Sequence, residues 1–258
     1  MPWTYPPQMG LFTQALSLLP VGLGYALFTG LGLAALLWTL FRLAPQTAAP
    51  ALMLTLPASL MNIRAGQNGF LIALLFALTF LFLLRQRRLA AGVSLGLLAV
   101  KPHLGLGLGL VALVRGGAVM VATAIVVLAL SLGLATWALG AEIWPAFLQS
   151  VRDSSTFLKA GAYPMERMIS IHALLSSMGV SSGISFLVQS VMALVSLGLI
   201  ALALLRRWRL DNLLALSGTA GLAVSPYGYD YDLVALTPRW RWACPRSHVK
   251  PAARSAPS

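Results

Sequence analysis

The chain has 258 residues, of which 59% are hydrophobic and only 9% are charged. A soluble globular domain carries about 25% charged residues, so the composition excludes one and predicts a polytopic membrane protein. The formal net charge is +12, but the cations form short clusters at the ends of apolar runs, which argues against nucleic-acid binding. The single cysteine, Cys244, excludes an internal disulfide and a cysteine-based metal cluster.

In chain order, a short apolar helix bounded by prolines is predicted at the membrane interface at residues 8–19. Eight apolar runs follow, several of them shorter than the roughly 20 residues that a full span needs. They lie at residues 21–41, 48–63, 70–84, 89–100, 104–114, 117–140, 184–205 and 213–224. The pattern predicts an all-α transmembrane bundle of about eight spans or half-spans. The one long loop, 141–183, is predicted to hold an interfacial helix at 147–158.

The arginine clusters predict the topology. They occur at every second helix end, at positions 42, 85–88, 115 and 206–209. The positive-inside rule places these ends in the cytoplasm. The remaining connections then face outward, and they are residues 1–6, 64–69, 101–103, 141–183 and 225–232. We therefore expect a multi-pass protein of the plasma (inner) membrane whose polar motifs face the extracytoplasmic side.

The motif Lys101-Pro102-His103 interrupts an apolar stretch. A lysine within a membrane segment costs roughly 2.5–3.5 kcal/mol on insertion scales, and the proline breaks the helix. A snorkelling lysine beside a helix-capping histidine is one interpretation. The other is a polar pocket in which Lys101 neutralises a phosphate leaving group and His103 assists by hydrogen bonding or proton transfer.

Three further outward motifs carry polar side chains. The first, at 66–69, is either a tight turn or a pocket wall made by Gln67 and Asn68, with Arg64 nearby as a second cation for phosphate. The second, at 163–167, places Glu166 beside Arg167, which a surface ion pair would also explain. The third begins the chain at 2–7, where aromatic side chains could anchor the interface or stack on sugar rings.

Residues 225–232 concentrate tyrosines and two carboxylates at a helix entrance. The pair Asp230-x-Asp232 only weakly resembles a metal site, and tyrosines at an interface are ordinary anchors. Two aspartates at that depth are less ordinary, and they favour substrate or sugar binding. Neither a metal nor a cofactor is predicted.

Together these motifs resemble glycosyltransferase family 87, the polyprenol-phosphate-mannose-dependent α-(1-2)-mannosyltransferase-like membrane proteins of the GT-C fold. The resemblance runs from Pro2 to about Leu236 and depends on five short motifs in the family's order. These are 2–7, 66–69, 90–92 leading into 101–105, 163–168, and 225–227 followed by 229–233.

The resemblance implies a reaction and a set of site residues. An acceptor hydroxyl, on a lipid or a glycan, attacks the sugar of a polyprenyl-phosphate donor, and a hexosyl group (mannose is expected) is transferred at the extracytoplasmic face. The phosphate would be bound by Lys101, His103, Arg64 and Arg167. The sugar or acceptor would be bound by Tyr5, Gln67, Asn68, Tyr163, Glu166, Tyr227, Asp230 and Asp232.

The resemblance also raises an expectation about the two ends. Proteins of this fold place a candidate catalytic aspartate in a first outer loop, which would precede Met1 here, so the catalytic base is unassigned and a truncated chain is expected. Residues 1–237 are predicted to form the glycosyltransferase-like domain. The Arg-, Pro- and Ser-rich residues 238–258 are predicted to be a frameshifted or disordered tail.

Two other functions remain open at this stage. An inactive fragment or non-catalytic membrane subunit would explain the unusual ends. A transporter would require repeated halves with broken helices in corresponding positions, and the sequence shows only one such break, at Lys101.

Overall fold

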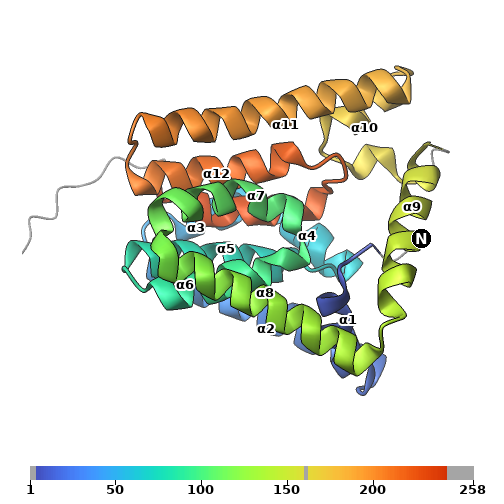
Figure 1. The fold of residues 1–258 in the computed structure, drawn as a ribbon, viewed down its shortest axis with the longest axis horizontal. Coiled ribbons are helices and arrows are strands. Elements are labelled where there is room, and N and C mark those ends of the chain that lie inside the picture. The colour runs from blue at the N-terminus through green and yellow to red at the C-terminus, as the bar shows by residue number, and fades with distance from the viewer. Residues whose placement is uncertain (1–3, 160–161, 243–258) are drawn as a thin grey trace, which may run out of the picture.

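The computed structural model describes residues 4–159 and 162–242, and within them the protein is built from helices without a β-strand (Figure 1). The structure is thus an all-α bundle, as predicted. The principal helices are α1 (Pro7–Ser17), α2 (Val21–Leu43), α3 (Ala48–Leu54), α4 (Leu56–Ala65), α5 (Gly69–Leu84), α6 (Arg88–Leu97), α7 (Pro102–Val111), α8 (Gly117–Leu139), α9 (Ile143–Lys159), α10 (Ile171–Ser177), α11 (Ser182–Leu205) and α12 (Leu210–Val224).

Within the described residues, three helical stretches are long and apolar enough to cross a bilayer. They are Val21–Leu43, Pro102–Leu139 and Ser182–Leu205, and shorter apolar helices lie beside them. Large side chains on the outer faces of α8 and α11 are exposed, among them Leu130 and Leu194 at 67% and 70%. Apolar side chains exposed in such numbers are typical of a surface that faces lipid.

Two helix breaks matter for the site, one within a predicted span and one between two predicted runs. The predicted run at 48–63 is two short helices, α3 and α4, which meet at Thr55. The helix break at Lys101 is confirmed. A short 3-10 turn, η1 (Leu98–Val100), ends α6, and Pro102 then begins α7 because its missing N–H costs nothing at a first helical position.

Glycines set how closely the central helices pack. A Cβ at Gly92 of α6 would lie 2.5 Å from the Met120 carbonyl oxygen of α8, and one at Gly96 would lie 2.7 Å from that of Ala124. This small-x-x-x-small spacing is typical of helices that approach closely in membranes. A similar contact joins α7 to α12, where a Cβ at Gly107 would lie 2.5 Å from the Ser217 carbonyl oxygen.

The arginine clusters lie together at one end of the bundle. Arg115, in the π-helical turn η2 (Ala112–Gly116), donates to the Trp208 carbonyl oxygen at 3.2 Å. The chain then reverses at Gly117, whose φ of +77° favours glycine, and Arg88 packs directly against this position. The loops at the opposite end hold the polar motifs, and we refer to it as the site end.

The chain leaves α12 into a 3-10 helix, η4 (Asp230–Trp242), that packs against α3, α4, α5 and α12. Val234 and Ala235 are fully buried, and Thr237 shares a 3.0 Å hydrogen bond with Thr55 at the α3–α4 break. The predicted tail at 238–258 falls largely outside the described residues, because the structure describes this chain only to residue 242. The division at residue 237 therefore stays a prediction.

Candidate functional site

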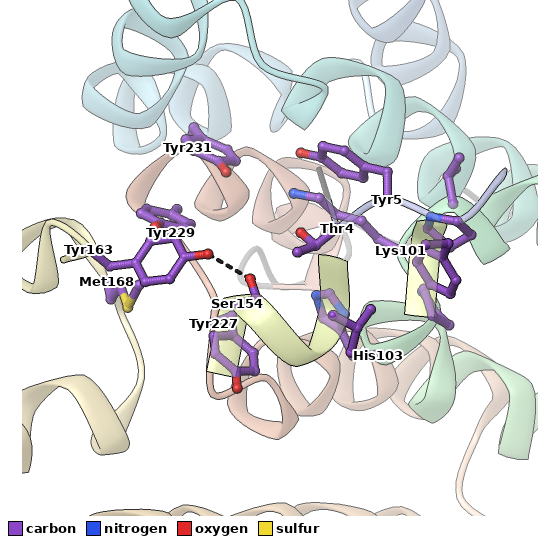
Figure 2. A pocket seen from close by; sticks show the side chains of 15 residues that line it. Thr4, Tyr5, Lys101, His103, Ser154, Tyr163, Met168, Tyr227, Tyr229 and Tyr231 are labelled. Atoms are coloured by element: carbon purple, nitrogen blue, oxygen red, sulfur yellow. Dashed lines mark hydrogen bonds between the residues drawn. The ribbon is translucent and has the colours of Figure 1, made fainter. Parts of the chain in front are cut away.

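A cavity of about 260 Å³ opens at the site end, and we refer to it as the central cavity (Figure 2). Its wall is drawn from segments far apart in the chain: the N-terminal segment, the α6–α7 break, α9, the segment before α10 and the segment after α12. The lining includes Tyr5, Lys101, His103, Ser154, Tyr163 and Tyr229. Four of the motifs predicted to share one face of the membrane, at 2–7, 101–103, 163–168 and 225–232, therefore contribute to one cavity.

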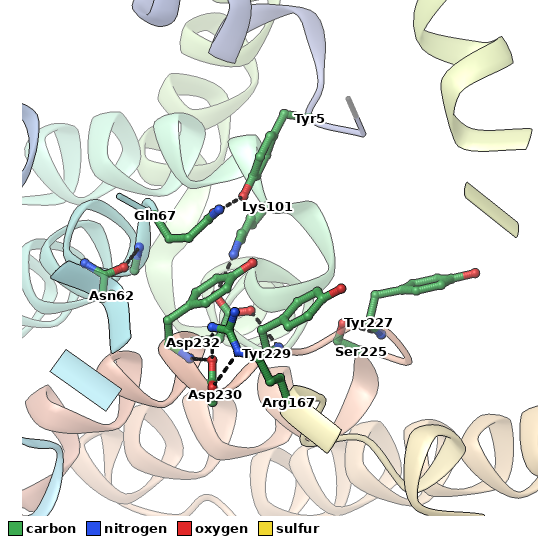
Figure 3. Close-up of polar contacts among 12 residues, drawn as sticks. Tyr5, Asn62, Gln67, Lys101, Arg167, Ser225, Tyr227, Tyr229, Asp230 and Asp232 are labelled. Atoms are coloured by element: carbon green, nitrogen blue, oxygen red, sulfur yellow. Dashed lines mark hydrogen bonds and ion pairs between the residues drawn. The ribbon is translucent and has the colours of Figure 1, made fainter. Parts of the chain in front are cut away.

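Lys101 is the cation of this cavity, and it is ion-paired. Its Nζ lies 2.5 Å from Oδ1 of Asp232, and the two side chains are 6% and 1% exposed (Figure 3). The ammonium also lies over the rings of Tyr231 and Tyr5, at 4.9 Å and 5.8 Å from their centroids. A buried pair of this kind is costly to break, because removing one partner leaves the other charge uncompensated. Lys101 is thus fixed in place, and it does not snorkel to solvent.

A second ion pair lies beside the first. Nε and Nη2 of Arg167 donate to the two carboxylate oxygens of Asp230 at 3.1 Å and 3.0 Å, which is the bidentate geometry that guanidinium favours. The hydrogen bonds to Asp230 raise the pKa of Arg167 above its ordinary value. The sequence suggested Glu166 as the neighbour of Arg167, but Glu166 is exposed and the guanidinium pairs with Asp230.

The two aspartates face different cations and do not form a metal pair. Asp230 also accepts a hydrogen bond from its neighbour's backbone, Tyr231 N, at 2.8 Å, and Asp232 accepts one from Tyr229 N at 3.2 Å. In the described part of the chain, no group of three or more His, Cys, Asp and Glu side chains lies close enough to hold a metal ion. The carboxylates instead orient the two cations.

Tyrosines form the aromatic side of the central cavity. The rings of Tyr229 and Tyr231 stack with centroids 5.4 Å apart and planes at 6°. Tyr163 shares a 2.6 Å hydrogen bond with Ser154 of α9, and Tyr227 lies at the rim with 38% of its surface exposed. Aromatic faces beside a hydrogen-bonding group suit the apolar face and the hydroxyls of a sugar.

Burial keeps these phenols neutral. It raises the pKa of Tyr229 to about 12 and that of Tyr231 further in the same direction. An unfolded tyrosine ionises near pH 10. Between about pH 10 and pH 12 the folded state therefore retains a proton that the unfolded state has lost, so the stability of the protein falls as the pH rises through this window.

We expect an absorbance titration at 295 nm to show this directly. Tyr229→Phe should remove an ionisation step near pH 12 from the titration of the folded protein. A wild-type titration complete by pH 11 would contradict the buried placement of Tyr229.

The turn between α4 and α5 adds amides to the site end. The Tyr5 hydroxyl donates to Oε1 of Gln67 at 3.1 Å, and Asn62 Oδ1 accepts from Gly69 N at 2.8 Å. Gly66 ends α4 in the left-handed conformation, with φ of +59°, so the segment forms a turn, and Gln67 and Asn68 of this turn also line a cavity. Asn68 is buried at 2% exposure, and neither of its side-chain polar atoms has a hydrogen-bond partner among the described residues.

Most of the predicted site residues therefore lie together, and two do not. Lys101, His103, Tyr5, Tyr163 and Tyr227 line the central cavity, and Asp232 and the Arg167–Asp230 pair lie next to it. Gln67 and Asn68 lie on the far side of Tyr5. The remaining two, Arg64 and Glu166, are exposed and do not line the cavity. Trp3 and Pro2 of the first motif lie outside the described residues.

Sequence reasoning missed several members of the site. Tyr229 and Tyr231 were not among the predicted site residues, although both belong to the segment 225–232, whose tyrosines were noted in the sequence. Asn62 was hidden inside a predicted span, where a buried amide is itself unusual. Nothing in the sequence pointed to Ser154, because α9 reaches the cavity only through the tertiary fold, and Met168 was present only as the last residue of the motif 163–168.

One known family matches the chain that carries this geometry. The model of glycosyltransferase family 87 matches residues 3–226, which is well over half of the chain and includes most of the cavity wall. No curated protein and no solved structure matches the chain.

Proposed function

The chain belongs to glycosyltransferase family 87, and from this membership we propose that it transfers a mannosyl group from a polyprenyl-phosphate donor to an acceptor hydroxyl at the extracytoplasmic face of the plasma membrane. The proposal rests on the position of Lys101. This lysine is held by a helix break in the wall of an aromatic-lined cavity. A fixed cation at that place is suited to the charge that develops on a departing phosphate.

A lipid-linked donor is supported by an apolar groove that begins at the central cavity. The groove has a volume of about 390 Å³ and is lined by α6, α7 and α8, and Pro102 belongs to both walls. Two glycines of α7, Gly105 and Gly109, lie along it. A donor whose phosphate lies at Lys101 has an apolar path for its polyprenyl chain along these glycines.

The step is a displacement at the anomeric carbon. The acceptor oxygen forms a bond to that carbon, and the bond to the phosphate oxygen breaks with its electron pair, which releases polyprenyl phosphate. The proton of the acceptor hydroxyl must pass to a base, and His103 supplies an imidazole at the same cavity wall. Lys101 stabilises the negative charge on the phosphate, and the tyrosines position the sugar.

The extracytoplasmic orientation is supported by the arginines. The arginine clusters at 42, 85–88, 115 and 206–209 lie at the end of the bundle opposite the cavity, and cytoplasmic loops of membrane proteins carry such an excess of positive charge. A donor presented at the outer leaflet would then have its phosphate at the depth of Lys101.

The test is transfer by the purified chain in lipid nanodiscs. We expect radiolabelled mannose to pass from polyprenyl-phosphate mannose to an acceptor lipid or glycoside. A radiolabelled nucleotide sugar offered as the donor should give no transfer. Gly109→Leu should raise the KM for a long-chain donor about tenfold, since it fills part of the groove, and should affect a short-chain donor less.

Gly198→Leu on α11 is the matched control. A Cβ added at Gly198 or at Gly109 would have no neighbouring atom within 4 Å, but Gly198 lies away from the groove. Equal effects of the two leucines would exclude the groove as the donor site. Absence of transfer from every polyprenyl-phosphate hexose offered would overturn the proposed function.

A further inference from the structure

We propose that a second cavity binds the acceptor and that this acceptor is an amphiphile, a polyhydroxylated head group attached to a hydrocarbon chain. The inference rests on the proposed function and assigns the second substrate of the same reaction. It is carried by the shape and lining of the cavity and by one buried side chain without a partner.

The second cavity lies between α1, α2 and the α4–α5 turn and has a volume of about 440 Å³. Tyr5 belongs to its wall and also to the wall of the central cavity, so the two cavities are neighbours across one side chain. Two substrates held on either side of Tyr5 would lie close enough to react at the boundary between the cavities.

One end of the second cavity is polar. Gln67 lies there and accepts the hydrogen bond of the Tyr5 hydroxyl, and Asn68 lies beside it. Asn68 is 2% exposed, yet its amide oxygen and its amide nitrogen both lack a hydrogen-bond partner within residues 4–159 and 162–242. A buried polar group left unpaired is destabilising, and this side chain makes no capping bond to α5.

A sugar or polyol head group would satisfy both atoms of Asn68. Each hydroxyl can donate and accept, so two neighbouring hydroxyls pair with the oxygen and the nitrogen of one amide. A phosphate would leave the amide oxygen unpaired, since it offers acceptors only, and a hydrocarbon would leave both atoms unpaired.

The other end of the second cavity is apolar. Leu16, Leu19, Val21 and Phe28 line it at the corner between α1 and α2. Val21 is 90% exposed, so this corner is open to the surroundings of the bundle. A ligand whose head group binds at Asn68 therefore has an apolar exit for a hydrocarbon chain, and this excludes a free sugar as the best fit.

The first experiment replaces Asn68 with leucine, which has a similar volume. We expect the KM for an alkyl mannoside acceptor to rise at least tenfold, with donor binding and the melting temperature unchanged or improved. If the amide had only a structural role, its loss would lower the melting temperature and leave the acceptor KM unchanged, and that result would overturn the proposal.

The second experiment fills the cavity and does not depend on Asn68. Thr13 lines the cavity from α1, and its hydroxyl bonds only to its own helix, at Met9 O and Gly10 O. Thr13→Phe should weaken the dependence of KM on acceptor chain length, which in the wild type should be about threefold to fourfold for each methylene that the cavity buries. The acceptor partitions equally into the nanodiscs of both proteins. The ratio of the two KM values at each chain length therefore reports the contribution of the cavity alone.

Thr219→Phe is the control for size. Thr219 is also helical and bonded to its own helix, at Ala215 O, but it is exposed on α12 and does not line the cavity. It should retain the wild-type dependence on chain length. An identical dependence in the Thr13→Phe and wild-type proteins would overturn the proposal.

A binding measurement separates this inference from the proposed function. A decyl mannoside with a diazirine in its chain, photolysed in the absence of donor, should label residues of α1 and α2 in the wild type and not in Thr13→Phe. Such labelling without any sugar transfer would contradict the proposed function and support the site. Transfer to alkyl mannosides without labelling at α1 and α2 would support the proposed function and overturn the second cavity as the acceptor site.

Discussion

Lys101→Met is expected to destabilise the protein and to remove its transfer activity, for two separable reasons. The substitution leaves the Asp232 carboxylate, 1% exposed, without its cation. Breaking a buried ion pair from one side costs about 3–5 kcal/mol, to be measured as the free energy of unfolding in detergent. It also removes the charge that stabilises the leaving phosphate, and loss of one such group lowers kcat by about 10²–10³.

The double variant Lys101→Met/Asp232→Asn distinguishes the two reasons. It removes both charges together, and the asparagine retains an oxygen for the hydrogen bond from Tyr229 N. Most of the lost stability should return, since replacing a whole buried pair is often nearly neutral. The activity should not return. A double variant with the wild-type kcat would show that the pair serves the fold alone.

The helices could be predicted from the sequence, and so could the location of the polar motifs at one end of the bundle, because both depend on local properties of the chain. Apolar runs give the spans, and the arginines at alternate ends give the order in which the chain crosses. The break at Lys101 followed from Pro102, whose effect on a helix is also local. Pro57, two residues after Thr55, is a similar local signal for the start of α4. The apolar pattern alone, however, predicts one span at 48–63.

The partners within the site could not be predicted, because they are set by tertiary packing. Lys101 and Asp232 are separated by 131 positions, and Arg167 and Asp230 by 63. The nearest carboxylate in sequence to Arg167 is Glu166, which is exposed. The burial of η4 is a second example. Its uninterrupted apolar run covers only residues 233–236, far too short to predict a buried helix, and the packing of α3, α4, α5 and α12 around it shows that it is central to the bundle.

The same packing explains why the cavity needs the whole bundle. Asp232 belongs to η4 and Lys101 to the α6–α7 break, and Gly69 allows η4 to approach α5, since a Cβ there would lie 2.6 Å from the Tyr231 carbonyl oxygen. The orientation of Lys101 therefore depends on helices that never touch a substrate. Substitutions at such packing positions should change both stability and activity.

Gly221→Ala is expected to have the largest effect among the packing positions. Gly221 of α12 faces α7, and an added Cβ would overlap the Leu104 carbonyl oxygen. A backbone atom cannot rotate away as a side chain can, so α7 must shift as a whole. Overpacking of this kind costs about 1–3 kcal/mol. The shift would also displace Pro102 and His103 at the start of α7, so kcat should fall together with the melting temperature.

The comparison for this prediction is Gly198→Ala on α11, another glycine of a membrane helix, where nothing lies within 4 Å of the added carbon. Both substitutions add one methyl group and raise helix propensity by about 1 kcal/mol. Gly198→Ala should therefore keep or raise the melting temperature, and only Gly221→Ala should lower it and slow transfer. If both variants were equally stable, α7 and α12 could not be in backbone contact, and the position of His103 in the cavity wall would need another cause.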